Sequence, residues 1–163
     1  VFRVKFKVSP ISFLKGSIFE SFIWIHVYMV LLLYPILTIL NIPATIFFYS
    51  KVFLHLGMFI SILGFILMVA AHAQMGKNWR MGTSKNTELV TTGLFGVSRN
   101  PVYLSLIIMS FGLFLVMQTK ESFWLMVLTT VLFRIVVMTE EKFLKEEFGE
   151  KCTLYMKNVK RFF

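Results

Sequence analysis

The segment at residues 89–103 is polar and contains glycine, whereas hydrophobic sequence precedes and follows it. Its end predicts the start of a helix, because Asn100 can cap, Pro101 suits the first helical position and an apolar run follows. Gly93 lets a ligand approach the backbone closely, and Arg99 beside a helix N-terminus favours an anion. The segment therefore predicts a ligand site; the alternative is an interfacial connector whose arginine meets lipid phosphates.

A second set of charged side chains that could bind a ligand lies later in the chain. Glu140 and Glu141 follow the last long apolar run, and Arg134 lies within the end of that run. A carboxylate can accept hydrogen bonds from a ligand, and a charge inside a membrane span is a functional candidate by default. Two simpler interpretations stay open. The acids could serve only to solvate a helix that leaves the membrane, and Arg134 could extend its guanidinium to the interface.

The composition is that of an integral membrane protein, since 57% of the 163 residues are hydrophobic and only 15% are charged. The net charge is +9, but the bases lie beside apolar runs, which is typical of a cytoplasmic membrane face that meets anionic lipid. We therefore exclude nucleic acid as a partner. The lone Cys152 excludes an internal disulfide and a cysteine-built metal site, and the three histidines have no ligand spacing, so we expect no metal.

Four apolar runs predict an all-α fold with four transmembrane helices in a single membrane domain, residues 1–163. The predicted spans are residues 22–40, 52–73, 101–118 and 123–138. Residues 74–100 form the loop that carries the predicted site, and residues 139–163 form C-terminal helices outside the bilayer.

Local patterns predict how these helices pack. Gly57, Ser61 and Gly64 form a small-residue stripe that lets another helix approach closely. The connection between the third and fourth spans is so short that these two helices must be antiparallel neighbours. The fourth helix continues to a glycine C-cap at Gly149, and residues 150–163 should then lie on the membrane or fold back over the site.

The distribution of positive charge predicts the orientation. Fourteen of the 17 Lys and Arg residues lie in the N-terminal segment, the central polar segment and the tail. The connections on the opposite side hold only Lys51 and Lys120. The positive-inside rule then places both termini, the polar segment and the glutamate pair on the cytoplasmic side.

These residues resemble the membrane-embedded methyltransferases, a group that includes isoprenylcysteine carboxyl methyltransferases and phospholipid N-methyltransferases. The first matching motif consists of Leu89, Val90, Gly93 and Phe95, followed by Arg99, Asn100, Pro101, Val102 and Tyr103. The second consists of Glu140, Glu141, Leu144, Phe148, Gly149, Tyr155 and Val159. Order, spacing and hydropathy agree together over roughly the last ninety residues.

The resemblance implies that S-adenosyl-L-methionine binds between the helix ends and the central loop, and that the acceptor is a lipid or lipidated molecule from the bilayer. An isoprenylcysteine carboxylate and a phospholipid amine are the two acceptor classes. The predicted cofactor-binding residues are Thr87, Glu88, Leu89, Val90, Gly93, Phe95, Arg99, Asn100, Pro101, Val102, Tyr103, Glu140 and Glu141. Arg134 is the candidate for orienting the substrate.

Individual roles follow from the chemistry of the side chains. Glu140 would accept hydrogen bonds from the ribose hydroxyls or the amino group, and Phe95 and Tyr103 would pack on the adenine. The helix end at Asn100, with Arg99, would receive the methionyl carboxylate.

The sequence departs from the family pattern at several positions. Asn100 replaces the usual histidine, Phe95 the usual tyrosine and Cys152 the first tail tyrosine. Val136 stands where the carboxyl methyltransferases carry a substrate-binding arginine, and Arg134 is two residues away. These departures disfavour a carboxylate acceptor but leave the cofactor prediction in place. Two alternatives remain: a membrane reductase of the sterol-reductase type that uses NADPH, and a non-catalytic scaffold or transporter.

Overall fold

The computed structural model describes residues 32, 36, 39–40, 44–76 and 88–163. The chain divides into two units, residues 1–42 and 43–163, and every named element lies in the second unit. The predicted span at residues 22–40 lies almost wholly outside the described residues.

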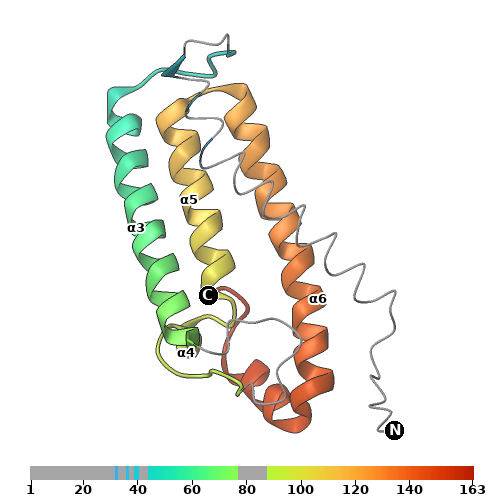
Figure 1. Cartoon of the computed structure of the whole chain (residues 1–163). Coiled ribbons are helices and arrows are strands. Elements are labelled where there is room, and N and C mark those ends of the chain that lie inside the picture. Colours follow the sequence, from blue (N-terminus) through green and yellow to red (C-terminus); the bar gives the residue numbers. More distant parts are fainter. Residues whose placement is uncertain (1–31, 33–35, 37–38, 41–43, 77–87) are drawn as a thin grey trace, which may run out of the picture. The chain divides into compact units, whose positions relative to one another are not determined.

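The described residues of the second unit form three long helices and one short helix. The helices are α3 (Lys51–Met75), α4 (Leu94–Val97), α5 (Pro101–Met117) and α6 (Lys120–Asn158). In Figure 1, α3, α5 and α6 run side by side with alternating direction, and α5 packs against both of the others. The prediction of an all-α fold is confirmed for the described residues, which contain no strand beyond an isolated bridge between Ile46 and Thr119.

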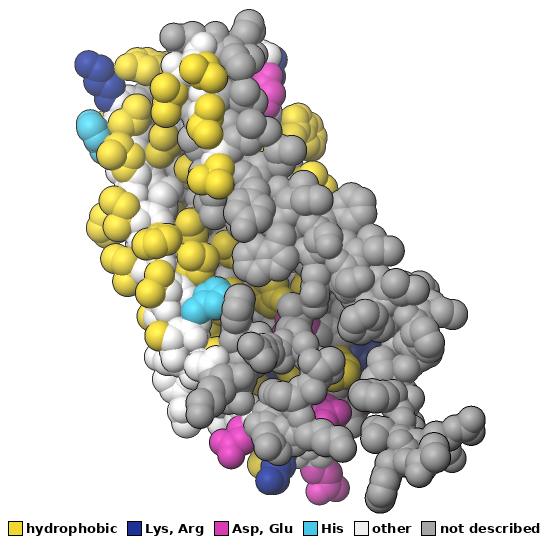
Figure 2. All heavy atoms as spheres, viewed as in Figure 1, with side chains coloured by type: hydrophobic (Ala, Val, Ile, Leu, Met, Phe, Trp, Pro, Cys, Tyr) yellow, Lys and Arg dark blue, Asp and Glu magenta, His cyan; other side chains and the backbone are white. Residues whose placement is uncertain are grey.

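The outer surface of α3 is apolar. Its buried residues, Gly57, Gly64 and Ala71, are all small, whereas large side chains such as Val52 and Phe59 are 73% and 65% exposed. Figure 2 shows apolar side chains gathered along this helix. Helices α3 and α6 are long and apolar enough to cross a membrane, and α5 is apolar but shorter. A continuous apolar surface of this kind favours contact with lipid over contact with water.

Glycines bring the backbones of α3 and α5 into direct contact. A Cβ atom added at Gly57 would lie 2.6 Å from the carbonyl oxygen of Gly112, and one added at Gly64 would lie 2.6 Å from Met109 Cγ. A Cβ added at Gly112 would in turn meet Ser61 Oγ. The stripe predicted from Gly57, Ser61 and Gly64 is therefore confirmed as a packing surface, and its partner is α5.

A tight turn joins α5 to α6, so the predicted antiparallel hairpin is confirmed. Gln118 adopts the left-handed conformation (φ 55°) that ends α5, and a capping box between Thr119 and Ser122 begins α6. The Gln118 side chain accepts a hydrogen bond from Ser50 N (2.6 Å) and donates one to Ser50 O (2.8 Å). These bonds attach the start of α3 to the turn at the same end of the helices.

Helix α6 is interrupted at Gly149, which has φ 56°. A residue with a Cβ atom rarely adopts this conformation, so glycine is the residue that permits the kink. A second helical stretch then continues to Asn158. The predicted break at Gly149 is confirmed, and the change of direction brings the last residues of the chain towards the start of α5 (Figure 1).

We predict that Gly57→Ala destabilises the protein by about 1–3 kcal/mol, because the added methyl group would overpack the contact with α5. In a helix without this contact the same change stabilises by about 0.5–1 kcal/mol. The matched control is Gly96→Ala, since a Cβ there would meet only Thr91 O, at 3.5 Å. Unfolding of the purified variants in detergent measures both effects; equal stabilities would contradict the close packing of α3 on α5.

Candidate active site

Glu141 lies at the centre of a buried polar network at the end of the helices where α4 is found. It follows Phe133 and Val137 at intervals of four residues, so all three occupy the same buried face of α6. Only 7% of Glu141 is exposed. Burying a carboxylate is costly unless charged or hydrogen-bonding groups surround it, so this position requires partners from other parts of the chain.

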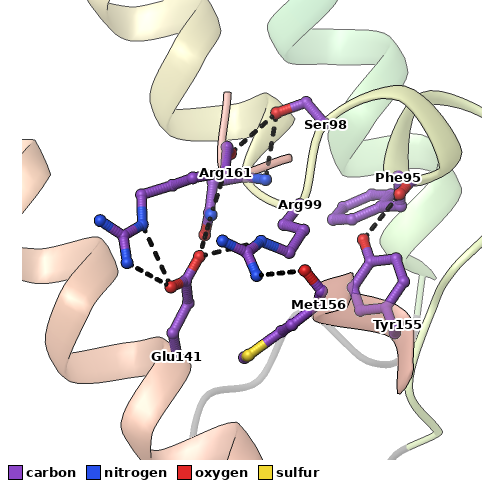
Figure 3. A network of polar contacts seen from close by, with 8 residues as sticks. Phe95, Ser98, Arg99, Glu141, Tyr155, Met156 and Arg161 are labelled. Carbon is purple, nitrogen blue, oxygen red and sulfur yellow. Dashed lines mark hydrogen bonds and ion pairs between the residues drawn. The ribbon is translucent and has the colours of Figure 1, made fainter. Parts of the chain in front are cut away.

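Two arginines and an asparagine supply those partners. Arg161 donates to Glu141 Oε2 from both Nε (3.1 Å) and Nη2 (2.8 Å), and Asn100 Nδ2 donates to Oε1 at 3.1 Å. Arg99 Nε lies 3.2 Å from Oε1 and forms an ion pair, although its N–H is not aligned for a hydrogen bond. Figure 3 shows both guanidinium groups turned towards the carboxylate of Glu141. The cluster of one acid and two bases keeps one excess positive charge.

The C-terminal residues lie against the segment that precedes α5. Arg99 N donates to Lys160 O at 3.0 Å, and Ser98 Oγ and Asn100 Nδ2 both donate to Arg161 O at 3.2 Å. Arg99 Nη1 also donates to Met156 O at 3.1 Å. Of the two predicted arrangements for residues 150–163, the structure therefore has the tail folded back over the site.

A further bond connects the tail to α4. The Tyr155 hydroxyl donates to Phe95 O at 2.6 Å, and both residues are buried. Burial raises the pKa of Tyr155 to about 12, although the charge of Arg99 opposes the shift. The phenol is therefore neutral at physiological pH and available as a donor. On the other side of α4, Leu94 N donates to Gln74 Oε1 at 2.8 Å, so α3 and the tail together fix this short helix.

One local expectation about Asn100 is wrong. Asn100 does occupy the N-cap position of α5, with Pro101 as the first helical residue, but its side chain makes no capping hydrogen bond. Its amide nitrogen donates to Glu141 and to Arg161 O, so these partners, and not the N–H groups of the first turn of α5, hold the side chain. Asn100 thus joins the start of α5 to α6 and to the tail.

The structure describes all but one of the other predicted cofactor-binding residues. Gly93, with φ 61°, immediately precedes α4, and the Tyr103 ring packs against Phe133 with centroids 5.6 Å apart. Glu88 is exposed, Pro101 is buried, and the half-buried residues are Leu89, Val90, Val102, Tyr103 and Glu140. Thr87 lies outside the described residues.

Arg134 is separate from this network. Its side chain is exposed, and within the part of the chain that the structure describes it takes part in no hydrogen bond or ion pair. It lies seven residues before Glu141, which is about 10 Å along the helix axis. The structure does not bring Arg134 to the loop that holds the other candidates.

The sequence did not identify three participants in the network: Arg161, Ser98 and the carbonyl of Met156. Arg161 was counted only as one of the basic residues of the tail. The available signal was Gly149, which predicts a break after which the tail can return, but no local pattern specifies which base then meets which acid.

We predict that Glu141→Ala destabilises the protein by about 2–4 kcal/mol, because it leaves Arg99, whose side chain is only 13% exposed, without its anionic partner. The lower limit of that range allows for Arg161, the other cationic partner of Glu141, because its side chain is 34% exposed and water can solvate it once the acid is removed. Glu147→Ala, which removes an exposed acid from the same helix, should stay within about 0.5 kcal/mol of the wild type. Comparable effects of the two substitutions on detergent unfolding would show that the network does not stabilise the fold.

The match to a known protein family covers most of these elements. No curated protein matches the sequence. Residues 52–151 match the sequence model of the family described as phospholipid methyltransferase. The matched region begins in α3, includes the loop, α5 and the glutamate pair, and ends just after the kink at Gly149. The predicted resemblance to membrane methyltransferases is thereby confirmed, and the chain belongs to the phospholipid methyltransferase family.

Proposed function

We propose that this protein transfers a methyl group from S-adenosylmethionine to a lipid-soluble acceptor that enters from the bilayer. The family supports methyl transfer to a lipid-type substrate. The observation that carries the proposal further is that the segment before α5 and Glu141 of α6, which are separated in sequence, meet in one buried network.

The side chains present suit the carboxylate of the cofactor's methionyl part. One excess positive charge remains in the cluster of Arg99, Arg161 and Glu141, next to the N-terminus of α5. Both features favour an anionic group such as a methionyl carboxylate. Because the guanidinium of Arg99 is already bonded to Met156 O and paired with Glu141, we assign it an electrostatic role rather than a direct contact.

Glu140 and Tyr103 are the residues that we assign to the remainder of the cofactor. Both are half-buried. The Glu140 carboxylate would accept hydrogen bonds from the ribose hydroxyls or the ammonium group, and the Tyr103 ring would pack on the adenine. Phe95 contributes by completing the buried wall of the loop, with its carbonyl held by Tyr155.

The reaction itself makes few demands on the protein. When bound, S-adenosylmethionine supplies an electrophilic methyl group: the acceptor lone pair forms the new bond while the carbon–sulfur bond breaks, and the sulfur leaves as a neutral thioether. The residues of the site have to hold donor and acceptor in line and exclude water. A buried network that fixes the loop is consistent with that requirement.

An amine acceptor suits this site better than a carboxylate acceptor. Val136, at the position of the substrate arginine in carboxyl methyltransferases, is buried, and Arg134 is exposed and outside the network. Neither residue offers a cation to a substrate carboxylate beside the loop. This supports a phospholipid amine as the acceptor and argues against a role for Arg134 in orienting the substrate.

We predict that the detergent-purified protein binds S-adenosylmethionine and does not bind NADPH, as measured by calorimetric titration. Glu140→Gln should weaken binding by about ten- to a hundredfold, because a charged hydrogen bond of about 1.5–3 kcal/mol is lost. Glu147→Gln is the matched control, since Glu147 is an exposed acid on the same helix and its neutralisation should leave affinity almost unchanged.

The titration also separates the alternatives. Binding of NADPH alone would replace the proposal by a membrane reductase, and binding of neither ligand would favour a non-catalytic membrane protein. Equal small effects of Glu140→Gln and Glu147→Gln on the affinity would keep S-adenosylmethionine as the cofactor but show that Glu140 does not contact it.

We further propose that the site faces the cytoplasm. Lys51 and Lys120 begin α3 and α6 at one end of the helices, whereas Arg99 and the bases of the tail lie at the other end. The positive-inside rule assigns the more basic end to the cytoplasmic side.

Single cysteines in oriented vesicles test this orientation. In a Cys152→Ser background, Lys151→Cys should react with an impermeant thiol reagent from the cytoplasmic side, and Lys120→Cys from the opposite side. Both native lysines are exposed, so access does not limit either reaction. Labelling of both positions from the same side would contradict the proposed topology.

A further inference from the structure

We propose that Arg161 is a positioning residue of the methyl-transfer site: it holds Ser98 and Asn100, and through them the start of α5, in the arrangement that binds the cofactor. This inference rests on the proposed function, because it concerns how the same site is kept in shape. Arg161 lies beyond the region that matches the family, so the matched residues do not include it.

Arg161 acts through both its side chain and its backbone. Its guanidinium donates twice to Glu141 Oε2, and its own carbonyl oxygen accepts from Ser98 Oγ and Asn100 Nδ2. In Figure 3 the residue lies between the acid on α6 and the segment before α5. The side-chain bonds therefore fix the position of a carbonyl on which the loop depends.

Asn100 completes a closed ring of hydrogen bonds. Its amide nitrogen donates to Glu141 Oε1 and also to the carbonyl oxygen of Arg161, whose guanidinium returns to the other oxygen of Glu141. Each of the three residues thus contacts the other two. Loss of the Arg161 side chain leaves the carbonyl of this residue present but without a fixed position, so Glu141 is the one partner that still orients the Asn100 amide.

The charges indicate that the fold survives the loss of Arg161. Arg99 remains 3.2 Å from Glu141 Oε1, so the buried carboxylate keeps a positive partner. The Arg161 side chain is also 34% exposed, and a truncation there opens no deep cavity. Its removal should therefore loosen the loop more than it destabilises the helices.

The test compares Arg161→Ala with the wild-type full chain in detergent by titration with S-adenosylmethionine. We expect about a tenfold or larger rise in Kd, with the melting temperature lowered by no more than a few degrees. Lys157→Ala is the matched control, because it removes the same charge from an exposed position in the last turn of α6, four residues before Arg161, and it should change Kd less than about twofold.

Two further measurements separate positioning from general stability. Arg161→Lys keeps the charge but loses the paired nitrogen contact, so it should restore part of the lost affinity. Hydrogen exchange at the Arg99 amide, whose N–H donates to Lys160 O, should accelerate in Arg161→Ala while amides within α5 stay protected. If Arg161→Ala does not fold, the Kd for S-adenosylmethionine and the exchange rate of the Arg99 amide are compared between Arg161→Lys and the wild type instead.

Each result has a distinct meaning. Wild-type affinity in a folded Arg161→Ala protein overturns the inference and leaves the proposed function intact. Uniformly faster exchange in α5 and α6 would show a structural role only. A wild-type protein that binds no S-adenosylmethionine contradicts the proposed function, and the positioning role falls with it.

Discussion

The burial of one negative charge governs how this end of the molecule is arranged. Glu141 lies on the packed face of α6, where an unpaired carboxylate would be costly. Asn100, Arg99 and Arg161 meet it from the segment before α5 and from the tail. Since Glu141 and these partners belong to three parts of the chain, satisfying a single carboxylate also fixes α6, the loop and the C-terminal residues relative to one another.

The rest of the fold meets a different constraint. The backbones of α3 and α5 touch at Gly57, Gly64 and Gly112, and the large apolar side chains of α3 are consequently directed outwards. Helices packed in this way gain little from burying large side chains and depend on close backbone contact instead. The surface of α3 is thus apolar, and both ion pairs of Glu141 lie at the end of the helices where α4 and the tail are found.

This division suits a protein of the phospholipid methyltransferase family. A lipid-type acceptor and a polar cofactor require an apolar surface and a polar pocket close together. Arg99 and Asn100 are already engaged within the protein, so they shape the loop, and Glu140 and Tyr103 are the residues that we assign to direct cofactor contact. The Tyr155 hydroxyl donates to Phe95 O in the same region. Because burial raises the pKa of Tyr155 to about 12, the phenol stays neutral and keeps the proton that it donates.

The sequence by itself determined the long helices α3, α5 and α6, the glycine stripe on α3, the hairpin between α5 and α6 and the break at Gly149, because each depends on residues within a few turns of one another. It also placed both halves of the candidate site, through motifs around Asn100 and Glu141. Only the tertiary structure decided that Glu141, rather than Glu140, is the buried acid of the pair and that Asn100 binds it instead of capping α5. The bond between Asn100 and Glu141 joins residues 41 positions apart, and those from Arg161 to Glu141 and from Tyr155 to Phe95 O join residues 20 and 60 positions apart. Such pairings depend on how the chain returns in space, which no local pattern of side chains specifies.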